Sequence, residues 1–189
     1  MKVLLTALWE ELPYKNICGY QVINTGVGKV NAAYAAMHLM GWMGYAEHIV
    51  NFGTAGAINK KVSGLVKPDV ILQRDMLAEP QAPRGFTPFE ESETAGAIMM
   101  NTGSNITLGT GDSFVMAHDP WFDYANVDLV DMEAYALAKC FKKRSMTYGS
   151  NFECYKWVSD FADENAAETW VENQSAGAQA FINEVESWT

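Results

Sequence analysis

Short hydrophobic runs along the chain alternate with longer segments in which apolar residues recur at helical spacing. The short runs predict buried strands, which lie at residues 3–8, 19–24, 47–52, 69–73, 105–109 and 155–158. The longer segments predict helices at residues 29–43, 131–141 and 166–186. Because several strands end in glycine-rich turns that lead into helices, the pattern indicates an α/β fold whose sheet is covered on both faces.

The segment from Arg74 to Thr94 departs from this alternation. It is rich in proline and also holds Arg84, Phe86 and Phe89. Long loops in compact domains are usually functional or disordered, and the aromatic and arginine content favours order. We therefore expect an ordered loop that crosses an edge of the sheet.

Composition narrows the possible functions. Of the 189 residues, 49% are hydrophobic and 19% charged, which is enough to bury a core in one domain spanning residues 1–189. The formal net charge is −10 and there is no basic run, so nucleic-acid binding is not expected. No apolar stretch approaches the roughly 18 residues that a membrane span needs. We expect no membrane association.

The cysteines and histidines suggest neither a disulfide framework nor a metal site. The three cysteines, Cys18, Cys140 and Cys154, form no CxxC pair, and the three histidines form no HxxxH pair. The apolar N-terminus meets Glu10 and Glu11 without a cleavage site for an export signal. These features predict a cytoplasmic protein without a metal or other cofactor.

Two glycine-rich turns follow predicted strands in the first third of the chain. Thr25-Gly26-Val27-Gly28 opens a helix, whose first backbone N–H groups can hold an anion or a polar ligand edge. In Gly53-Thr54-Ala55-Gly56, Thr54 offers a hydroxyl and the glycines let a ligand approach closely. Turn geometry alone explains the glycines of both segments equally well. The first turn is not a dinucleotide fingerprint, because the GxGxxG spacing fails at Asn31.

Aromatic and acidic residues follow two later strands. In Gly109–Val115, Phe114 could stack on a flat ring and the Val115 backbone could pair with a base edge, or Phe114 could simply lie in the core. In Asp131-Met132-Glu133, the carboxylates suit the start of a helix. Alternatively, Glu133 could accept two charge-assisted hydrogen bonds from the hydroxyls of a ribose.

The last predicted strand leads into Ser159-Asp160-Phe161-Ala162-Asp163. Asp160 could act as a general acid if burial raises its pKa. A role for Ser159, Asp160 or Asp163 as a helix cap is the alternative.

Together these motifs are far more specific than any one of them. In this order they resemble the purine nucleoside phosphorylase superfamily, and within it most closely the methylthioadenosine/S-adenosylhomocysteine nucleosidase branch. The resemblance extends from Met1 to about Asp163, and the closing helix fits by position. It implies a three-layer αβα fold with a central mixed, partly closed β-sheet flanked by helices.

The resemblance also implies a role for each matching residue around the water and the sugar. Glu11, or as second choice Glu10, orients the attacking water. Thr54 stands in place of the family's serine near the water or anion. Met132 and Glu133 hold the ribose.

For the base, the resemblance assigns Ser113-Phe114-Val115 to the purine pocket, with Phe114 stacked on the ring. Asp160 protonates the purine at N7, and Ser159 lies beside it. One departure is Lys156, where the family often has arginine.

The nucleophile can be water or phosphate. A phosphorylase needs cationic side chains for a dianionic phosphate, but no arginine precedes Arg74, and Glu10 and Glu11 would repel phosphate. We therefore expect a nucleosidase that releases adenine from methylthioadenosine, S-adenosylhomocysteine or 5′-deoxyadenosine. A phosphate-dependent phosphorylase and an inactive nucleoside-binding protein stay open as alternatives. The family is commonly dimeric, which implies a homodimer with a small-molecule nucleoside as its ligand.

Overall fold

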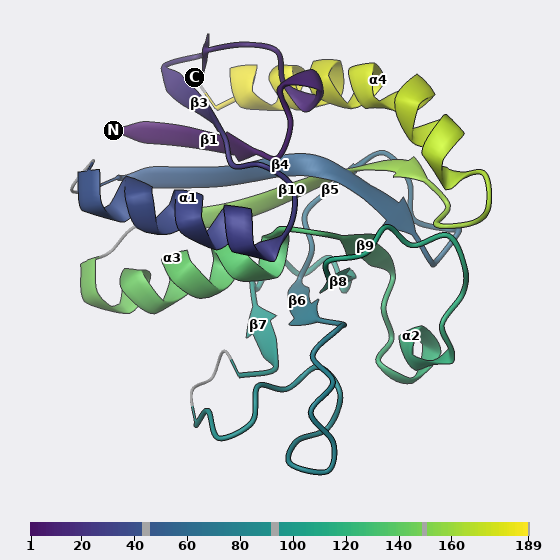
Figure 1. Ribbon diagram of the computed structural model, residues 1–189. Coiled ribbons are helices and arrows are strands. Elements are labelled where there is room, and N and C mark those ends of the chain that lie inside the picture. The colour runs from purple at the N-terminus through teal and green to yellow at the C-terminus, as the bar shows by residue number, and fades with distance from the viewer. Residues whose placement is uncertain (43–45, 92–94, 149–150, 189) are drawn as a thin grey trace.

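The computed structural model describes residues 1–42, 46–91, 95–148 and 151–188. A mixed β-sheet runs through the centre of the molecule, and helices cover both of its faces (Figure 1). The strands are β1 (Lys2–Thr6), β2 (Asn16–Ile17), β3 (Tyr20–Asn24), β4 (His48–Ala57), β5 (Leu65–Val66), β6 (Val70–Gln73), β7 (Ala97–Met99), β8 (Thr107–Thr110), β9 (Leu129–Asp131) and β10 (Asn151–Asp160). The helices are α1 (Lys29–Trp42), α2 (Pro120–Tyr124), α3 (Ala134–Tyr148) and α4 (Ala166–Glu186), and a short 3₁₀ turn covers Trp9–Glu11.

Alternating side chains of β1 divide the core into two layers. Val3 and Leu5 pack in the cluster that also contains residues of α1 and α3, whereas Leu4 packs with Phe181 and Val185 of α4. Because successive residues of a strand point to opposite faces, this alternation places α1 and α3 on one face of the sheet and α4 on the other. Figure 1 shows the same three layers. The predicted αβα architecture is confirmed.

The sheet is mixed and branched at β4. Its main order is β2-β3-β1-β4-β9-β8-β6-β7, and β10 pairs with both β4 and β5. Strands β1 and β10 run parallel to β4, while β9 meets its end in antiparallel pairing at Gly56 and Ala57. Among the described residues the outer strands β2 and β7 do not pair with each other. The sheet is therefore open, and the partly closed sheet that the resemblance implied is not formed.

Several predicted boundaries were wrong for one physical reason. Gly53–Gly56 was expected to be a turn, but it continues β4 because β10 pairs with it from Lys156 to Asp160. Asp131 was expected in a helix but ends β9, and α3 begins only at Ala134. In both places pairing with neighbouring strands, which a single sequence does not display, overrides the local signal.

The other differences are small. The strands β2, β5 and β7 have two or three residues and were not predicted, nor were β9 and the short α2. The predicted helix 29–43 and loop 74–94 each end in residues outside the described part of the chain. Helix α4 was predicted with the bounds that the structure shows.

The loop after β6 is tied to the rest of the molecule over residues 74–91. Arg84 donates to the carbonyl oxygen of Arg74 (2.8 Å), pairs with Asp119 (2.7 Å) and lies over the Trp121 ring (4.5 Å). The order expected of this loop is thus supported by specific contacts. Of the helices that the structure describes, none is both long and apolar enough to cross a membrane.

Candidate active site

A cavity of about 230 Å³ opens at the carboxyl ends of the central strands. Its lining includes all eight predicted site residues, which come from segments far apart in the sequence. They are Glu11, Thr54, Phe114, Val115, Met132, Glu133, Ser159 and Asp160. Glu10, the second choice for the water-orienting residue, is exposed and is not part of this lining.

Glu11 is buried and accepts five hydrogen bonds. One carboxylate oxygen accepts from the Thr54 N–H and hydroxyl, both at 2.8 Å. The other accepts from the Thr6 hydroxyl (2.8 Å) and from the N–H groups of Ala7 (3.1 Å) and Leu8 (3.2 Å). The short 3₁₀ turn after β1 directs this carboxylate toward β4. Five donors stabilise a negative charge there, and no described cationic side chain forms an ion pair with it.

Gly53 provides the space in which two opposite charges approach. A side chain at this position would meet the Lys156 ammonium at 3.3 Å and the Glu11 carboxylate at 3.4 Å. A Cβ at this position would fit only if both side chains moved by a few tenths of an ångström. Lys156, noted in the sequence only as a departure from arginine, therefore lies close to the site.

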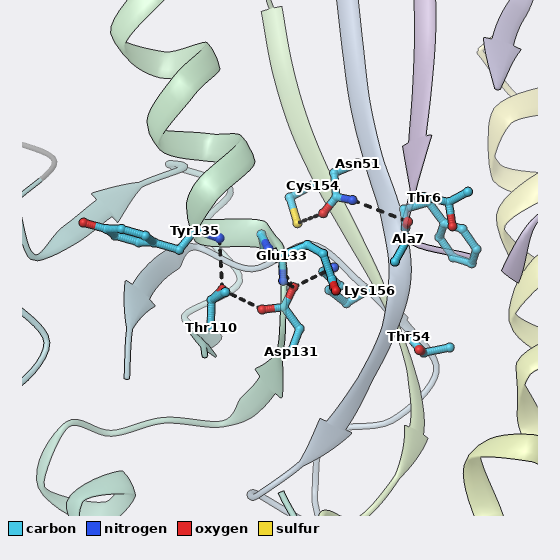
Figure 2. A network of polar contacts seen from close by, with 12 residues as sticks. Thr6, Ala7, Asn51, Thr54, Thr110, Asp131, Glu133, Tyr135, Cys154 and Lys156 are labelled. Carbon is cyan, nitrogen blue, oxygen red and sulfur yellow. Dashed lines mark hydrogen bonds and ion pairs between the residues drawn. The ribbon is translucent and has the colours of Figure 1, made fainter. Parts of the chain in front are cut away.

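Figure 2 shows the buried polar network beside the cavity. The Lys156 ammonium pairs with Asp131 at 2.8 Å, and both side chains are almost completely buried. Asp131 also accepts from the Thr110 hydroxyl (2.5 Å) and from the Ala134 N–H (2.9 Å) at the start of α3. Burial is the largest single influence and would lower the pKa of Lys156, but the Asp131 carboxylate, together with the other acidic neighbours, outweighs burial and raises it. Lys156 therefore keeps its proton and its positive charge.

Glu133 lies between the end of β9 and the start of α3, and is buried. One of its oxygens accepts the Gly28 N–H at 2.8 Å. Burial, reinforced by the Asp131 charge, raises the pKa of Glu133 to about 7, although Lys156 and the Gly28 N–H oppose the shift. Near neutral pH this carboxyl group can thus gain or lose its charge easily.

Asp160 ends β10, where the pairing with β4 shifts register and sets Asp160 opposite Gly56. It accepts from the Ser159 hydroxyl (2.8 Å) and from the Ala162 N–H (2.9 Å). Burial raises the pKa of Asp160 in spite of these two hydrogen bonds. Asn165, not Asp160, is the N-cap residue of α4, so the capping alternative is wrong for this aspartate.

The wall formed by residues 113–115 is held by Arg74. Its guanidinium donates to the Ser113 hydroxyl (2.9 Å), the Gly111 carbonyl (3.0 Å) and the Ser113 carbonyl. Phe114 is 47% exposed, so the alternative that places it in the core is wrong. An aromatic ring held at the rim of a cavity can stack on a planar ligand.

The turn that opens α1 is occupied by carboxylates of the protein itself. The Gly28 N–H donates to Glu133, and the Lys29 N–H donates to Asp112 at 2.7 Å. The Lys29 ammonium pairs with Asp75, which lies at the base of the 74–91 loop. Helix N-termini bind anions through such N–H groups, but here internal anions already fill the positions.

Arg74 and Trp170 are lining residues that the sequence analysis did not place at the site. Trp170 lies on α4, and its indole N–H donates to the Thr54 hydroxyl at 2.9 Å. Nothing in the local pattern distinguishes Trp170 from a packing residue of an amphipathic helix. Lys156 had a usable signal, because a lysine within an apolar strand must find a buried partner. In the described part of the chain, no group of three or more His, Cys, Asp or Glu side chains is arranged to hold a metal.

Solved structures with the same fold are numerous. A methylthioadenosine/S-adenosylhomocysteine nucleosidase from Helicobacter pylori superposes with a TM-score of 0.83 at 19% identity, covering 99% of this chain and 97% of that one. Futalosine hydrolase of the same organism has a TM-score of 0.79 at 19% identity, with coverages of 97% and 95%. An S-adenosylhomocysteine nucleosidase from Streptococcus pyogenes has a TM-score of 0.75 at 22% identity, with coverages of 100% and 98%. At these identities the similarity establishes the fold.

A search of curated proteins by sequence found no match. The family model of the phosphorylase superfamily, in contrast, matches residues 19–187, which is most of the chain. That range includes the Gly53–Gly56 segment, Glu133 and Asp160. The chain therefore belongs to the phosphorylase superfamily.

Proposed function

We propose that this protein is a purine nucleosidase that uses water to cleave the N-glycosidic bond of an adenine nucleoside. The observation that carries the proposal is the position of Glu11. Its carboxylate accepts from both the N–H and the hydroxyl of Thr54, a β4 residue that lines the cavity. A phosphate would need such donors, and would have to displace a buried carboxylate to reach them.

The charges around the cavity also favour water over phosphate. Arg74, the arginine of the lining, already donates to Gly111 and Ser113. Two carboxylates, Glu11 and Glu133, face the same space as the carboxyl group of Asp160. A dianion is repelled by such a site, whereas the oxocarbenium-like sugar of glycosidic cleavage is stabilised by it.

Asp160 supplies the leaving-group chemistry in this proposal. A protonated Asp160 donates its proton to N7 of the purine, so that the base leaves as a neutral species. Its raised pKa supports this role, because a general acid must hold its proton until the transition state. Ser159 orients the carboxyl group through its 2.8 Å hydrogen bond.

Glu133 and the ring residues hold the substrate. One Glu133 oxygen is engaged by Gly28, which leaves the other to accept from ribose hydroxyls. Met132 flanks the sugar, Phe114 stacks on the purine, and the Val115 backbone pairs with the base edge. Each of these residues lines the cavity.

We propose adenine nucleosides with a 5′ substituent as the substrate class, such as methylthioadenosine, S-adenosylhomocysteine or 5′-deoxyadenosine. The names of the superposed nucleosidases support this class. The apolar side chains of Leu8, Val27 and Trp170 in the lining suit the apolar part of such a 5′ group, next to the sugar.

We further propose a homodimer. The outer face of α1 exposes Val30, Tyr34 and Met37 with 79%, 72% and 60% of their surfaces accessible. These residues follow one another at helical spacing, and an exposed apolar stripe of this kind is typical of an interaction surface. Light scattering of the wild type and of Tyr34→Glu tests it: the variant should be smaller in mass. A wild-type monomer at micromolar concentration contradicts the dimer.

Product analysis tests the function itself. The protein is incubated with methylthioadenosine, S-adenosylhomocysteine, 5′-deoxyadenosine, adenosine, inosine and futalosine, each with and without phosphate. The proposal predicts free adenine and free sugar at the same rate in both buffers. Sugar 1-phosphate formed only with phosphate would identify a phosphorylase. Saturable binding without turnover would identify a nucleoside-binding protein.

A further inference from the structure

A chain of hydrogen bonds links α4, β4 and the turn after β1 at the edge of the cavity. The Trp170 indole N–H donates to the Thr54 hydroxyl oxygen (2.9 Å), and the Thr54 hydroxyl lies 2.8 Å from the Glu11 carboxylate. An indole N–H can only donate, and a carboxylate can only accept. The Thr54 proton must therefore point to Glu11, and the direction of the whole chain is fixed.

Glu11 has no acceptor position left for a water. A carboxylate offers about four lone-pair sites, and Glu11 accepts five hydrogen bonds from Thr6, Ala7, Leu8 and Thr54. Three of the five donors are backbone N–H groups, which cannot turn away. A water that is to lose a proton to Glu11 directly would have to displace one of these donors.

The Thr54 oxygen has one position left. Of its four tetrahedral positions, Cβ fills one, its own proton points to Glu11, and one lone pair accepts the Trp170 N–H. Among the described residues, no other group bonds to this oxygen. Thr54 and Trp170 both line the cavity, so the second lone pair is available to a water that lies there.

We propose that the Thr54 hydroxyl, not Glu11 itself, contacts the nucleophilic water and relays its proton to Glu11, with Trp170 as the positioning residue. This inference rests on the proposed hydrolysis. As the water oxygen bonds to C1′, its proton passes to the Thr54 oxygen and the Thr54 proton passes to Glu11. The C1′–N9 bond breaks, its electron pair goes to the purine, and Asp160 donates a proton at N7.

The position of Trp170 is set by the packing of α4 against β10. The Trp157 indole N–H donates to the Asn173 carbonyl (3.1 Å), and the Asn173 amide donates to the Ser159 carbonyl (2.9 Å). Gly177 allows this contact, because a Cβ there would approach the Trp157 ring to 2.6 Å. The same helix therefore positions Trp170 and contacts the strand that carries Asp160.

Single-turnover kinetics of four variants test the relay. Thr54→Val keeps the shape but removes the hydroxyl, and should lower the rate of cleavage by about 10²-fold or more. Thr54→Ser should restore most of it. Trp170→Phe keeps a ring but loses the N–H, and should lower the rate by about 2- to 10-fold, the equivalent of one neutral hydrogen bond, with little change in KM. The matched control is Trp188→Phe. Trp188 follows the far end of α4, and its indole N–H donates to Glu184, so this variant should keep the wild-type rate.

A double variant separates the relay from a merely structural role. If Thr54 and Glu11 move the same proton, Thr54→Val combined with Glu11→Gln should be no slower than the slower single variant. If the rate reductions of the two single variants multiply in the double variant, Thr54 and Glu11 act independently and the relay is overturned. A Thr54→Val rate within threefold of the wild type would also overturn it. If the wild type itself releases no base from any nucleoside, the proposed hydrolysis fails and the relay fails with it.

Discussion

Burial gives Asp160 the property that a general acid needs. Its pKa is raised, so the carboxyl group stays protonated to a higher pH than a free aspartate with a pKa of about 3.9. As the pH rises through the shifted pKa, the acid is lost. We therefore predict that kcat/KM falls on the alkaline side, and a flat profile from pH 5 to pH 9 would contradict the assignment.

Replacing Asp160 with asparagine tests the same role without changing the shape of the site. Asparagine cannot donate an acidic proton to N7, so turnover should fall by about 10²- to 10⁴-fold. Affinity for a non-cleavable adenosine analogue, measured by calorimetry, should change little. A variant with wild-type turnover would show that another group protonates the base.

Glu133 should control the acidic side of the profile. Its pKa of about 7 means that it becomes neutral as the pH falls through 7, and the neutral form is a weaker acceptor for ribose hydroxyls. We predict a KM that rises below pH 7 in the wild type. In Glu133→Gln the KM should be high at every pH and the limb near pH 7 should be absent. If the KM of Glu133→Gln still rises as the pH falls below 7, another group causes the rise.

The same shift predicts an effect on stability with a defined sign. A folded-state pKa above the usual 4.5 means that the folded protein binds more protons than the unfolded chain between these values, so stability falls as the pH rises from 4.5 to 7. Glu133→Gln removes this loss. Its Tm at pH 8 should exceed that of the wild type, and an equal or lower Tm would contradict the burial argument.

At the scale of elements, the site depends on small residues in the second half of β4. A Cβ at Gly56 would lie 2.7 Å from an Asp160 oxygen and 3.2 Å from the Ala162 Cβ. Gly56→Ala should therefore displace Asp160, reduce turnover strongly and lower the free energy of unfolding by about 1–3 kcal/mol. Gly41→Ala in α1 is the control, because a Cβ there meets nothing within 4 Å. That variant should be as active and at least as stable as the wild type.

Strand β4 also shows what the sequence could and could not predict about elements. Helix α4 was predicted with its full bounds, because helical spacing persists over 21 residues. Strand β4 was predicted to stop at Gly53, since glycine normally weakens a strand. It continues because β10 pairs with it through Asp160. Pairing partners distant in sequence are not visible in a local pattern.

At the scale of the whole molecule, a second polar cluster lies at the opposite end of the sheet from the cavity. Glu153 accepts from His48 (2.9 Å) and pairs with Lys67 (2.5 Å), and His48 shares a hydrogen bond with Tyr20 (2.7 Å). The hydrogen bond with His48 is the main cause that lowers the pKa of Glu153 to about 2, with Lys67 reinforcing it against burial. This cluster joins β3, β4 and β10, and none of its four residues is part of the cavity lining.

Glu153 should contribute to stability at neutral pH but not in strong acid. A carboxylate with a depressed pKa stabilises the fold above the unfolded value near 4.5, and this contribution is lost as the pH falls toward 2. Because the group is partly exposed, we expect Glu153→Gln to cost only about 1 kcal/mol at pH 7. Urea unfolding should show that the difference from the wild type shrinks below pH 4.5. A difference that is independent of pH would contradict the electrostatic explanation.

The arrangement of the site was only partly accessible from the sequence. The ordered motifs identified the residues that line the cavity, and the structure brings Glu11, Glu133 and Asp160 together as expected. The hydrogen bonds that saturate Glu11, and the donation from Trp170, depend on how α4 and the turn after β1 pack, so no spacing rule predicts them. The burial of Lys156 against Asp131 likewise depends on strand order.

Cleavage of a nucleoside in H₂¹⁸O with phosphate present, followed by mass spectrometry of the sugar product, shows directly whether water is the nucleophile. If water is the nucleophile, the sugar is released free with one ¹⁸O at C1′, together with one equivalent of free adenine. Sugar 1-phosphate without ¹⁸O at C1′ would contradict the proposed hydrolysis, because phosphate would then be the nucleophile despite the position of Glu11.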